Sequence, residues 1–352
     1  MGRARRKVAV AMSGGVDSSV AALLLKEAGY EVVGFTMLRE GTSVKGGKVS
    51  DQEVEEAKKV CSFLGIEHFL LNVTQTLEEK VIKPFIQEYR EGKTPNPCVN
   101  CNRFVKFGAL WDEIALRGFD YLATGHYARL QEKDGRPVLM KARDISKDQS
   151  YFLHAVDRAS LAKVIFPLGD YTKTQVRQWA KERRIPTAER KESQDICFIP
   201  ADGYGAFLSE RGVTIEPGDF VDRQGHPMGK HRGSLLYTVG QRARLGGIRS
   251  GRLYVISVDP KRNLVFLGKR EDLLSRRLVA DRVNILVDDL PLRCEAKIRY
   301  AHRPVACRVE MEAEKLTVTF DEPQEAVTPG QFVVLYFGEV VLGGGRIIAS
   351  GR

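Results

Sequence analysis

A short glycine-containing segment near the N-terminus has the composition of a phosphate-binding loop. Residues 11–18 read Ala-Met-Ser-Gly-Gly-Val-Asp-Ser and directly follow an apolar run. Two glycines let the backbone turn after a strand, and a helix beginning near Ser19 would point its N-terminal amides at a bound anion. Ser13 and Ser18 add hydroxyl groups, and Asp17 adds a carboxylate of the kind that binds Mg²⁺ beside a phosphate. The segment predicts a nucleotide site, with an ordinary tight strand-to-helix turn as the alternative.

This loop differs from the two commonest phosphate-binding motifs. No Gly-Lys-Ser or Gly-Lys-Thr follows it directly, so it is not a Walker A loop and brings no lysine of its own to the phosphates. It also lacks the Gly-x-Gly-x-x-Gly pattern of dinucleotide sites. The segment resembles the signature loop of the ATP pyrophosphatases, which split ATP between its α and β phosphates. That resemblance implies an enzyme that adenylates a carbonyl oxygen and then lets a nucleophile expel AMP.

A second segment that could do chemistry carries two thiols. Residues 94–102 read Thr-Pro-Asn-Pro-Cys-Val-Asn-Cys-Asn, which places Cys98 and Cys101 just before an expected helix. A helix N-terminus lowers a thiol pKa, so we expect both to have more thiolate than usual. This spacing is typical of redox, metal or sulfur chemistry, and the alternative is a pair of buried thiols. A third thiol, Cys197, lies between an isoleucine and a phenylalanine and by itself would be interpreted as a core residue.

Length and composition limit the classes of protein. The chain has 352 residues, which is too long for one ordinary domain and predicts two or three. No apolar run approaches the length of a membrane span, and no apolar signal segment is evident near the N-terminus. We therefore expect a cytoplasmic protein with no membrane partner. Its six cysteines are then expected to stay reduced, which disfavours a disulfide scaffold.

Positive charge is concentrated in one segment of the chain. The formal net charge is +10, and residues 223–258 contain no Asp or Glu. Such a segment suits a polyanion such as nucleic acid, and the alternative is a solvated basic face. The basic residues of the segment are Arg223, Lys230, Arg232, Arg242, Arg244, Arg249 and Arg252.

Apolar patterning predicts an α/β fold in the first half of the chain. Strands that alternate with helices indicate a parallel sheet with helices on both faces, whose ligands bind beyond the carboxyl ends of the strands. Cys61 lies on the apolar face of one of these helices and is expected in the core. The strands are expected over residues 8–12, 31–38, 67–73 and 121–124, and the helices over 51–64 and 103–117.

The second half of the chain differs in composition and in its apolar pattern. Glycine becomes frequent after about residue 205, which is typical of a small, loop-rich domain. Short β-type segments at 293–299, 305–310, 316–320 and 332–337 then predict a closed or nearly closed antiparallel barrel. The domains predicted are a nucleotide-binding PP-loop domain over 1–205, a small basic central domain over 206–276 and a C-terminal β-barrel over 277–352.

Several motifs, in their order along the chain, resemble the bacterial tRNA-specific 2-thiouridylase family (MnmA). The similarity covers nearly the whole chain. The motifs are Ser-Gly-Gly-Val-Asp-Ser-Ser at 13–19, Thr-Pro-Asn-Pro-Cys-x-x-Cys-Asn at 94–102, Ala-Thr-Gly-His-Tyr at 123–127, Lys-Asp-Gln-Ser-Tyr-Phe-Leu at 147–153, Asp-Ile-Cys-Phe-Ile at 195–199, Tyr-Thr-Val-Gly-Gln-Arg at 237–242 and Leu-Gly-Gly-Gly at 342–345.

This resemblance implies a reaction. The family replaces the carbon-2 oxygen of the wobble uridine with sulfur in the tRNAs for Lys, Glu and Gln. ATP, expected with Mg²⁺, activates that oxygen as an adenylate. In the persulfide scheme, Cys197 receives sulfur from a cysteine desulfurase or a sulfur relay protein. Cys101 then attacks the persulfide and frees the sulfur, or resolves the product as a disulfide.

The resemblance also assigns site residues by position. Cys101 and Cys197 align with the catalytic residues, and Asn96, Pro97 and Cys98 align with the segment that faces the target base. The ATP-binding positions are Ala11, Met12, Ser13, Gly14, Gly15, Val16, Asp17, Ser18, Met37 and Gly125. The positions that contact tRNA are Lys147, Asp148, Gln149, Arg299 and Tyr300.

Two departures from the family pattern affect these assignments. Some members carry aspartate where this chain has Cys98, and residues 242–246 read Arg-Ala-Arg-Leu-Gly where Arg-Lys-Gly-Leu-Gly is usual. With a thiol at position 98, Cys98, Cys101 and Cys197 are also three candidate ligands of a [4Fe–4S] cluster with one iron left open. A structural zinc site is less favoured, because no fourth ligand is evident.

Other functions remain as alternatives. An ATP pyrophosphatase that amidates a small molecule would share the loop but would have no use for the three thiols or the basic segment. A non-catalytic tRNA-binding or iron–sulfur carrier protein would have no need of the loop. His126, in Thr-Gly-His-Tyr, could polarise a phosphate or could be a helix-cap or core histidine.

Overall fold

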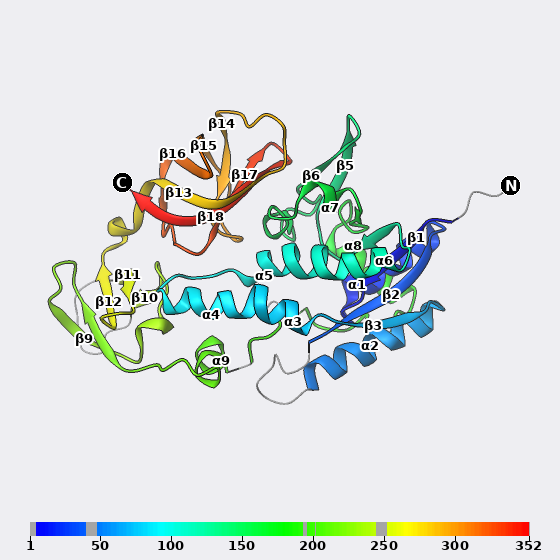
Figure 1. Cartoon of the computed structure of the whole chain (residues 1–352), viewed down its shortest axis with the longest axis horizontal. Helices are drawn as coiled ribbons and strands as arrows, with labels where there is room; N and C mark the ends of the chain where they lie inside the picture. The colour runs from blue at the N-terminus through cyan, green and yellow to red at the C-terminus, as the bar shows by residue number, and fades with distance from the viewer. Residues whose placement is uncertain (1–4, 40–47, 193–195, 201, 244–251, 352) are drawn as a thin grey trace. The chain divides into compact units, whose positions relative to one another are not determined.

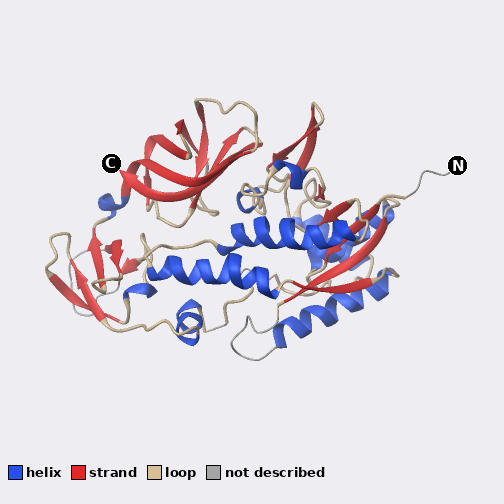
Figure 2. Ribbon diagram, viewed as in Figure 1, coloured by secondary structure: helices blue, strands red, loops and turns tan. Residues whose placement is uncertain are grey.

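The computed structural model describes residues 5–39, 48–192, 196–200, 202–243 and 252–351, whose helices and strands are drawn in Figures 1 and 2. The chain forms two compact units. The first unit comprises Met1–Val81, Cys98–Phe198 and Glu339–Leu342. The second comprises Ile82–Pro97, Ile199–Gly338 and Gly343–Arg352. The division into three domains at residues 205 and 276 stays a prediction.

A parallel five-stranded sheet forms the centre of the first unit. Its order is β3-β2-β1-β4-β7, and each neighbouring pair of strands is parallel, which confirms the predicted α/β fold. Val8 and Val10 of the central strand are fully buried, as expected for a strand covered on both faces. The strands are β1 (Lys7–Ala11), β2 (Glu31–Leu38), β3 (His68–Asn72), β4 (Tyr121–Ala123) and β7 (Val164–Ile165).

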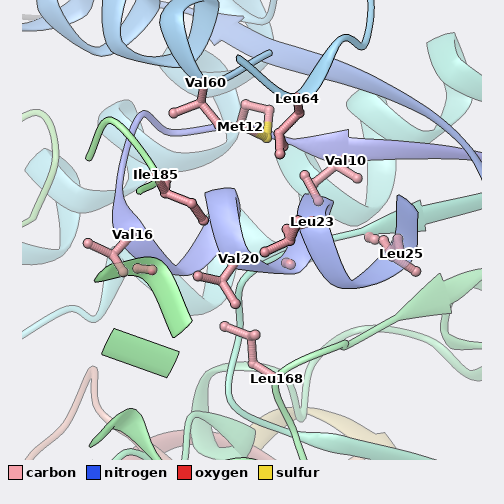
Figure 3. Packing of buried hydrophobic residues seen from close by; sticks show 14 of the residues in the cluster. Val10, Met12, Val16, Val20, Leu23, Leu25, Val60, Leu64, Leu168 and Ile185 are labelled. Atoms are coloured by element: carbon pink, nitrogen blue, oxygen red, sulfur yellow. The ribbon is translucent and has the colours of Figure 1, made fainter. Parts of the chain in front are cut away.

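Helix α1 (Val16–Glu27) is the central helix of this unit and is buried along most of its length. Figure 3 shows Val20 and Leu23 of α1 packed among side chains from distant parts of the chain, including Leu168 and Ile185. A helix that is buried on several sides needs apolar or small residues all round, and the run Val-Ala-Ala-Leu-Leu-Leu supplies them. This packing fixes the N-terminus of α1, where the predicted nucleotide loop ends.

Helix α2 (Lys48–Leu64) covers part of the same sheet and confirms the helix predicted over 51–64. Cys61 is 1% exposed, so its prediction as a core residue is confirmed, and burial raises the pKa of its thiol to about 11. Gly34 of β2 gives this sulfur its space, because a Cβ there would lie 2.6 Å from Cys61 Sγ. The other helices of the first unit include α3 (Thr74–Leu77), η3 (Ser150–Phe152), α7 (Arg158–Leu161) and α8 (Lys173–Glu182).

The helical segment that carries the paired thiols is longer than predicted. It runs through α5 (Pro97–Asn100), the π-helical η2 (Cys101–Ala109) and α6 (Leu110–Leu116), whereas a helix was expected over 103–117. Proline is well suited to the first position of a helix, which explains the earlier start. Short π-helical segments inside helices are frequent at functional sites.

The first unit also contains an antiparallel hairpin that the sequence did not predict. It is formed by β5 (Arg129–Lys133) and β6 (Arg136–Met140), and Met140 pairs with Val340. The turn residues Asp134 and Gly135 both have positive φ, of 52° and 73°, as a two-residue hairpin turn requires.

In the second unit, the region expected to be loop-rich contains a sheet of short strands. The strand order is β10-β11-β12-β8-β9, around a small core that includes Phe220 and Val255. The strands are β8 (Gly218–Val221), β9 (Pro227–His231), β10 (Arg242–Ala243), β11 (Leu253–Asp259) and β12 (Leu264–Gly268). Helical elements of the unit include α4 (Lys83–Arg90), α9 (Tyr204–Glu210), η4 (Ser234–Leu236) and η5 (Arg270–Leu273).

The C-terminal part of the second unit is the predicted antiparallel barrel. The order β13-β16-β15-β14-β17-β18 is closed by pairing of β13 with β18. β13 and β18 were not predicted. For β18, the reason is a run of glycines, which normally disfavours a strand. The glycine at 343 is needed there, since a Cβ would lie 2.1 Å from the carbonyl oxygen of Asn284 on β13. The strands are β13 (Leu274–Ile285), β14 (Arg293–Lys297), β15 (Val305–Glu312), β16 (Lys315–Glu325), β17 (Phe332–Phe337) and β18 (Val340–Gly351).

Across the ranges that the structure describes, none of the helices combines the length and the apolar character needed to span a membrane.

Candidate active site

The predicted nucleotide loop lies at the switch point of the parallel sheet. Strand β1 has β2 on one side and β4 on the other, so the connections leave it in opposite directions. Ligands of such sheets bind in the crevice beyond the carboxyl ends of the strands at this point. The loop at residues 12–15 follows the carboxyl end of β1, and Thr-Gly-His-Tyr follows the carboxyl end of β4. The fold therefore brings two of the sequence motifs to one edge.

The loop itself can be built only with glycine at position 14. Gly14 has a φ of 67°, and a Cβ there would lie 2.7 Å from the carbonyl oxygen of Glu53. The Ser18 hydroxyl accepts a hydrogen bond from the Ser13 backbone N–H at 3.2 Å, which closes the turn. Arg190 donates to the Gly14 carbonyl oxygen at 2.6 Å. These contacts hold the loop in one conformation before any ligand binds.

Helix α1 begins at Val16, three residues earlier than the expected start at Ser19. Gly15 is already in the N-cap position with extended backbone angles, φ −93° and ψ 165°. As a result, Asp17 lies in the first turn, at the positive end of the helix dipole. The side chain of Val16 is only 5% exposed, so its backbone N–H is the group that could face a phosphate.

The remaining predicted ATP-binding residues lie around this loop to different degrees. Gly125 packs against the first turn of α1, since a Cβ there would lie 2.8 Å from the Ser18 backbone nitrogen. Met37 is half-buried near the carboxyl end of β2, and Ala11 is half-buried at the end of β1. Met12 is 2% exposed and belongs to the core, so its side chain does not reach the site.

Asp17 is bound by a lysine that comes from far along the chain. Nζ of Lys173, the first residue of α8, lies 2.7 Å from both carboxylate oxygens of Asp17. The Tyr127 hydroxyl donates a third hydrogen bond to Asp17 at 2.9 Å, and burial, with the Asp17 charge next, raises the pKa of Tyr127 far above its usual value. The loop carboxylate is thus fully hydrogen-bonded in this structure.

Lys173 is shared between the loop and a second carboxylate. Its Nζ is 2.8 Å from Glu192, which also forms ion pairs with Lys147 at 2.8 Å and Arg177 at 3.6 Å. Burial opposes ionisation of Glu192, but its hydrogen bonds with Lys147 and Lys173 outweigh burial and lower its pKa to about 2. Glu192 precedes Cys197 by five residues, so this network joins the nucleotide loop to the start of the segment with the third thiol.

Lys147, Asp148 and Gln149 lie beside the nucleotide loop and have structural partners of their own. The Asp148 carboxylate is 4% exposed and accepts hydrogen bonds from the backbone N–H groups of Ala142 at 2.9 Å and Ser150 at 3.2 Å. The Gln149 side-chain oxygen accepts from the Tyr127 N–H at 2.9 Å. In this geometry Gln149 positions the Thr-Gly-His-Tyr segment and Asp148 holds the backbone at Ala142 and Ser150, and their role as tRNA contacts stays a prediction.

Asp17 has the oxygen donors that Mg²⁺ prefers, but Lys173 already occupies both of them. An ion carried by the phosphates of ATP would therefore meet a carboxylate that has to release the lysine first. Asp17 is the residue of the loop that would hold Mg²⁺, and the ion would neutralise phosphate charge.

The three predicted thiols belong to the first unit and interact with one another. Cys98 and Cys101 are half-buried on the helical segment, whereas Cys197 is exposed. The charge of Cys197 acts on the pKa of both other thiols, and that of Cys98 acts on Cys101. The fold thus brings Cys197, which is distant in the sequence, close enough for its charge to act on the Cys98 and Cys101 pair.

The expectation that Cys98 and Cys101 have lowered pKa values was wrong. Burial raises both, and it raises the pKa of Cys101 to about 12. The physical reason is that the helix starts at Pro97, so Cys101 lies inside the helical segment and away from the exposed amides of its first turn. At neutral pH, Cys101 is therefore held as a thiol.

Two cations oppose this effect of burial, and sequence reasoning missed both. Lys106 lowers the pKa of Cys98 and of Cys101, and Arg39 lowers that of Cys101. The π-helical segment that carries Lys106 begins at Cys101 itself. The signal that could have found Lys106 was a lysine in the first turn of the helix predicted directly after the thiols.

His126 is a hydrogen-bonding partner of Lys106. Its Nε2 is 3.4 Å from Lys106 Nζ, and its Nδ1 is 2.7 Å from the Thr124 hydroxyl. Burial, with Lys106 next, lowers the pKa of His126 well below its usual value. The imidazole is therefore neutral and accepts from Lys106. Rings of Phe107 and Phe166 pack on it at 6.0 and 6.1 Å.

Arg39 connects the exposed thiol to the nucleotide side of the unit. It directly follows the end of β2, and its side chain hydrogen-bonds Cys197 and Glu53. Burial by itself would lower the pKa of Arg39, but the charges of Cys197 and Glu53 outweigh burial and raise it. Because Gly14 packs on the backbone of Glu53, this contact places Cys197 near the loop.

The geometry does not match a metal site at the three thiols. Among residues 5–39, 48–192, 196–200, 202–243 and 252–351, no three His, Cys, Asp or Glu side chains are grouped so that they could hold a metal ion. Cys98, Cys101 and Cys197 all fall within these ranges. Their present arrangement therefore does not fit the proposed [4Fe–4S] ligand set.

The other predicted substrate residues belong to the second unit. Asn96 and Pro97 end the segment that precedes Cys98, and this segment is attached to the barrel: the Thr94 N–H donates to Pro329 O at 3.0 Å, and Gln331 Nε2 donates to Thr94 O at 2.7 Å.

Arg299 and Tyr300 lie on the barrel side of this unit. Arg299 Nη2 donates to Val239 O at 2.9 Å and to the Thr328 hydroxyl at 2.5 Å. Tyr300 is 36% exposed, with Lys297 Nζ 5.4 Å from its ring centroid. Arg299 thus ties loops of the second unit together, and Tyr300 offers a ring at the surface.

The basic segment is only partly described. Arg242, Arg232 and Arg252 are exposed, while Arg223 pairs with Asp272 at 2.5 Å and Lys230 with Asp219 at 2.8 Å. Arg244 and Arg249 lie outside the described residues, as do residues 193–195 of the Cys197 motif.

Models of known protein families match three consecutive parts of the chain. A tRNA methyl transferase HUP domain matches residues 6–201, a tRNA methyl transferase PRC-barrel domain matches residues 205–269, and an aminomethyltransferase β-barrel domain matches residues 275–347. The first of these matches covers more than half of the 352 residues.

Curated relatives are similar over nearly the full length. The tRNA-specific 2-thiouridylase MnmA 1 of Syntrophus aciditrophicus (strain SB) is 48% identical over 346 residues, which cover 97% of this chain and 93% of the relative. The tRNA-specific 2-thiouridylase MnmA of Pelobacter propionicus is 47% identical, with 98% of each chain covered. The same-named protein of Carboxydothermus hydrogenoformans is 45% identical, with 97% of this chain and 98% of that protein covered.

Proposed function

Because this chain belongs to the tRNA-specific 2-thiouridylase family, we propose that it replaces the carbon-2 oxygen of a tRNA uridine with sulfur in an ATP-dependent reaction. The enzyme is a sulfurtransferase. The observation that carries the detailed proposal is the meeting of three separate motifs in the first unit. These are the nucleotide loop after β1, the thiol pair on the helical segment and the exposed Cys197, which Arg39 holds.

The first step is adenylation of the base. A carbonyl oxygen is a poor leaving group, and transfer of the adenylyl group of ATP to it makes it a good one. The uridine oxygen forms a bond to the α phosphorus, and the bond from this phosphorus to the β-phosphate oxygen breaks, so pyrophosphate leaves with the electron pair. The loop amides at the start of α1 and the Ser13 and Ser18 hydroxyls are the groups that would hold the phosphates.

The second step is transfer of sulfur from a persulfide on Cys197. Its terminal sulfur attacks carbon 2, and AMP leaves with the former uridine oxygen. The Cys101 thiolate then attacks the Cys197 sulfur, which breaks the S–S bond of the former persulfide and frees the thiocarbonyl. This leaves a Cys101–Cys197 disulfide, and a dithiol reductant returns it to two thiols for the next turnover.

The exposure of the two thiols suits this division of labour. Cys197 is exposed, so a cysteine desulfurase or a sulfur relay protein would have access to load it. Cys101 is half-buried and held as a thiol by its raised pKa, so it does not consume the persulfide before the substrate arrives. Lys106 and Arg39 supply the positive charge that favours its thiolate at the moment of attack.

The tRNA is proposed to bind through phosphate contacts, with Asn96, Pro97 and Cys98 in the segment that faces the target base, as in the family. Phosphate contacts position a nucleic acid, and a flipped base is read by shape and hydrogen bonds. The wobble uridine of the tRNAs for Lys, Glu and Gln is the expected target, as in the family. The exposed basic residues of the second unit, such as Arg242, supply charge for this binding.

The direct test is reconstitution with purified components. The protein is incubated with unmodified tRNA, Mg-ATP, a cysteine desulfurase with cysteine, and a dithiol, and the digested nucleosides are analysed by mass spectrometry. The proposal expects 2-thiouridine at the wobble position together with AMP and pyrophosphate. Formation of ADP and phosphate, or 2-thiouridine formed equally well without ATP, would refute the adenylation step.

A further inference from the structure

We propose that Cys294 and Cys307 are a modification site, at which a peroxide forms a reversible disulfide across two strands of the C-terminal barrel. Both cysteines belong to the second unit, whereas Cys98, Cys101 and Cys197 belong to the first. The pair is therefore separate from the thiols of the proposed sulfur transfer, and it does not depend on that reaction.

The register of two neighbouring strands places the thiols opposite each other. Cys294 of β14 pairs with Cys307 of β15 in the antiparallel ladder. In the same register, the Val309 N–H donates to Leu292 O at 3.0 Å, so residues 292 and 309 are a hydrogen-bonded pair. Because hydrogen-bonded pairs alternate with the other kind, 294 and 307 form such a pair as well, with Cα atoms about 5.5 Å apart. This separation lies within the range that a disulfide spans.

The two side chains lie on the same face of the sheet and touch each other. Sγ of Cys294 is 3.8 Å from Sγ of Cys307, a hydrogen-bonding distance for two thiols. A disulfide bond of about 2.05 Å brings the sulfurs about 1.8 Å closer than they are now. Rotation of the two side chains about χ1 supplies a movement of this size, so the strands can stay paired.

The two thiols differ in a way that sets the order of oxidation. Cys294 is 8% exposed and Cys307 is 1% exposed, so a small oxidant reaches Cys294 first. The hydrogen bond with Cys307 lowers the pKa of Cys294, whereas the same bond, followed by burial, raises the pKa of Cys307. The thiolate is the form that attacks an oxidant. Cys294 is therefore the thiol that is oxidised, and Cys307 is the thiol that resolves the product.

The reaction with hydrogen peroxide then has two steps. The Cys294 thiolate attacks one peroxide oxygen, so that the S–O bond forms, the O–O bond breaks, and hydroxide leaves with the electron pair and becomes water by taking up a proton. This leaves a sulfenic acid on Cys294. The Cys307 sulfur attacks the Cys294 sulfur, which forms the S–S bond, breaks the S–O bond and releases a second water. In total the two thiols lose two electrons and two protons, and the peroxide is reduced to two waters.

The hairpin closed by this disulfide carries two of the predicted tRNA contacts. Residues 298–304 join β14 to β15 and include Arg299 and Tyr300. A disulfide restricts the unfolded chain more than the folded one, so we expect it to stabilise the barrel. It would fix a strand pairing that the reduced barrel already has, and it would leave the connecting residues in place.

Two core thiols that only fill space are the alternative to this role. Cys61 represents that case, because it is 1% exposed like Cys307 and its sulfur packs against Gly34 of the neighbouring strand. Burial alone therefore does not separate the two interpretations. The pairing register and the contact between the two sulfurs do, and Cys61 serves as a control within the same molecule.

The test is peptide mass spectrometry of the full-length protein after treatment with hydrogen peroxide. Trypsin cuts after Arg293 and Lys297, so the two thiols fall in different peptides, 294–297 and 300–308. We expect these peptides to be joined in the treated wild type and separated again by a dithiol. Cys61 is expected to remain a free thiol in the same sample.

Two variants test the order of the steps, and a melting curve tests the effect on the barrel. In Cys307→Ala the sulfenic acid has no partner, so dimedone should label Cys294. In Cys294→Ala we expect at least about fivefold less labelling of Cys307. In the variant Cys101→Ser/Cys197→Ser, which removes the other reactive pair, peroxide is expected to raise the melting temperature by about 3 °C or more.

Other results would overturn the proposal. Peptides 294–297 and 300–308 that stay unjoined at a peroxide dose that fully oxidises the exposed Cys197 would show that the pair is a core contact only. Equal dimedone labelling in Cys307→Ala and Cys294→Ala would contradict the assigned order. A joined peptide with a lower melting temperature would show that the barrel has to be distorted to form the bond, against the geometry described above.

Discussion

Nζ of Lys106 lies 3.4 Å from Nε2 of His126, and the other ring nitrogen of this histidine is bonded to Thr124. Burial, followed by the charge of Lys106, lowers the pKa of His126, so the imidazole is neutral at physiological pH. A neutral partner orients the lysine and leaves its charge uncompensated. That charge acts on Cys98 and Cys101, whose pKa values it lowers against the effect of burial.

Lys106→Met is therefore expected to move the pH profile of thiolation. Without this cation the pKa of Cys101 rises further from about 12, so the rate at neutral pH falls about tenfold or more and rises more steeply with pH. Single-turnover thiolation measured between pH 6.5 and 9.5 checks this, with Lys58→Met, at an exposed site, as the control. Lys106→Arg should restore most of the rate. A profile of unchanged shape in Lys106→Met would show that its charge does not act on the thiol.

Cys101→Ser and Cys197→Ser are each expected to abolish thiolation and to leave tRNA affinity within about twofold. The two thiols serve sulfur transfer, whereas affinity comes mainly from contacts of Lys and Arg with phosphates. Filter binding and nucleoside analysis measure the two properties separately. Cys61→Ala, which removes a fully buried thiol, should remain active. Substantial turnover in either serine variant would return that cysteine to a structural role.

Arg39→Met is expected to slow the reaction of Cys197 with iodoacetamide at pH 7 about three- to tenfold, because the guanidinium that hydrogen-bonds this sulfur is lost. Peptide mass spectrometry after timed alkylation gives the rate at Cys197 separately from the other cysteines. The alkylation rate of Cys197 in Arg39→Lys should fall between the rates in the wild type and in Arg39→Met, because lysine keeps the charge but loses the planar geometry of the guanidinium group. Equal alkylation rates in all three proteins would contradict the contact.

Glu192→Gln is expected to reduce the loss of stability in acid. In the folded protein the pKa of Glu192 is lowered to about 2, because the hydrogen bonds to Lys147 and Lys173 outweigh burial. A carboxyl group of this kind stabilises the fold above its unfolded pKa of about 4.3 and loses that contribution as pH falls toward 2. Chemical unfolding at pH 7, 4 and 3 should show a smaller decrease with pH in Glu192→Gln than in the wild type. An identical pH dependence would mean that Glu192 does not make these ion pairs in solution.

Anaerobic purification is expected to give a colourless protein. The described residues do not group Cys98, Cys101 and Cys197 as ligands of a metal, and the persulfide scheme needs none. Cys98→Ser should then keep measurable thiolation with a cysteine desulfurase. A brown protein with the absorption of an iron–sulfur cluster, lost together with activity in Cys98→Ser, would establish the cluster-dependent reaction instead.

Much of the architecture could be predicted from local pattern. The alternation of strands and helices gave the parallel sheet, since buried parallel strands are short apolar runs such as residues 8–10. The barrel was predicted from its recurrent short segments, although β13 and β18 were missed. Their pairing depends on the close approach of Gly343 to Asn284, a contact between residues 59 positions apart that propensity does not encode.

The site residues also divide into those that local sequence predicts and those that only the fold reveals. The motif residues were found because glycines, thiols and a carboxylate at short spacing have a recognisable chemistry. Lys173, Glu192 and Arg39 were missed because each reaches its partner through the fold and stands in no local motif. The thiol pKa was misjudged for a related reason: the helix was predicted to start at residue 103, after the thiols, whereas it starts at Pro97, and the sequence did not reveal that burial would dominate.

The central claim, adenylation of the carbon-2 oxygen followed by its replacement with sulfur, is tested most directly by isotope transfer. A tRNA carrying ¹⁸O at carbon 2 of its wobble uridine is thiolated with Mg-ATP and a sulfur donor, and the AMP is analysed by mass spectrometry. The account predicts one ¹⁸O in AMP for each 2-thiouridine formed, and none in pyrophosphate. AMP without the label, while 2-thiouridine accumulates, would show that the oxygen leaves by another route and would contradict the mechanism.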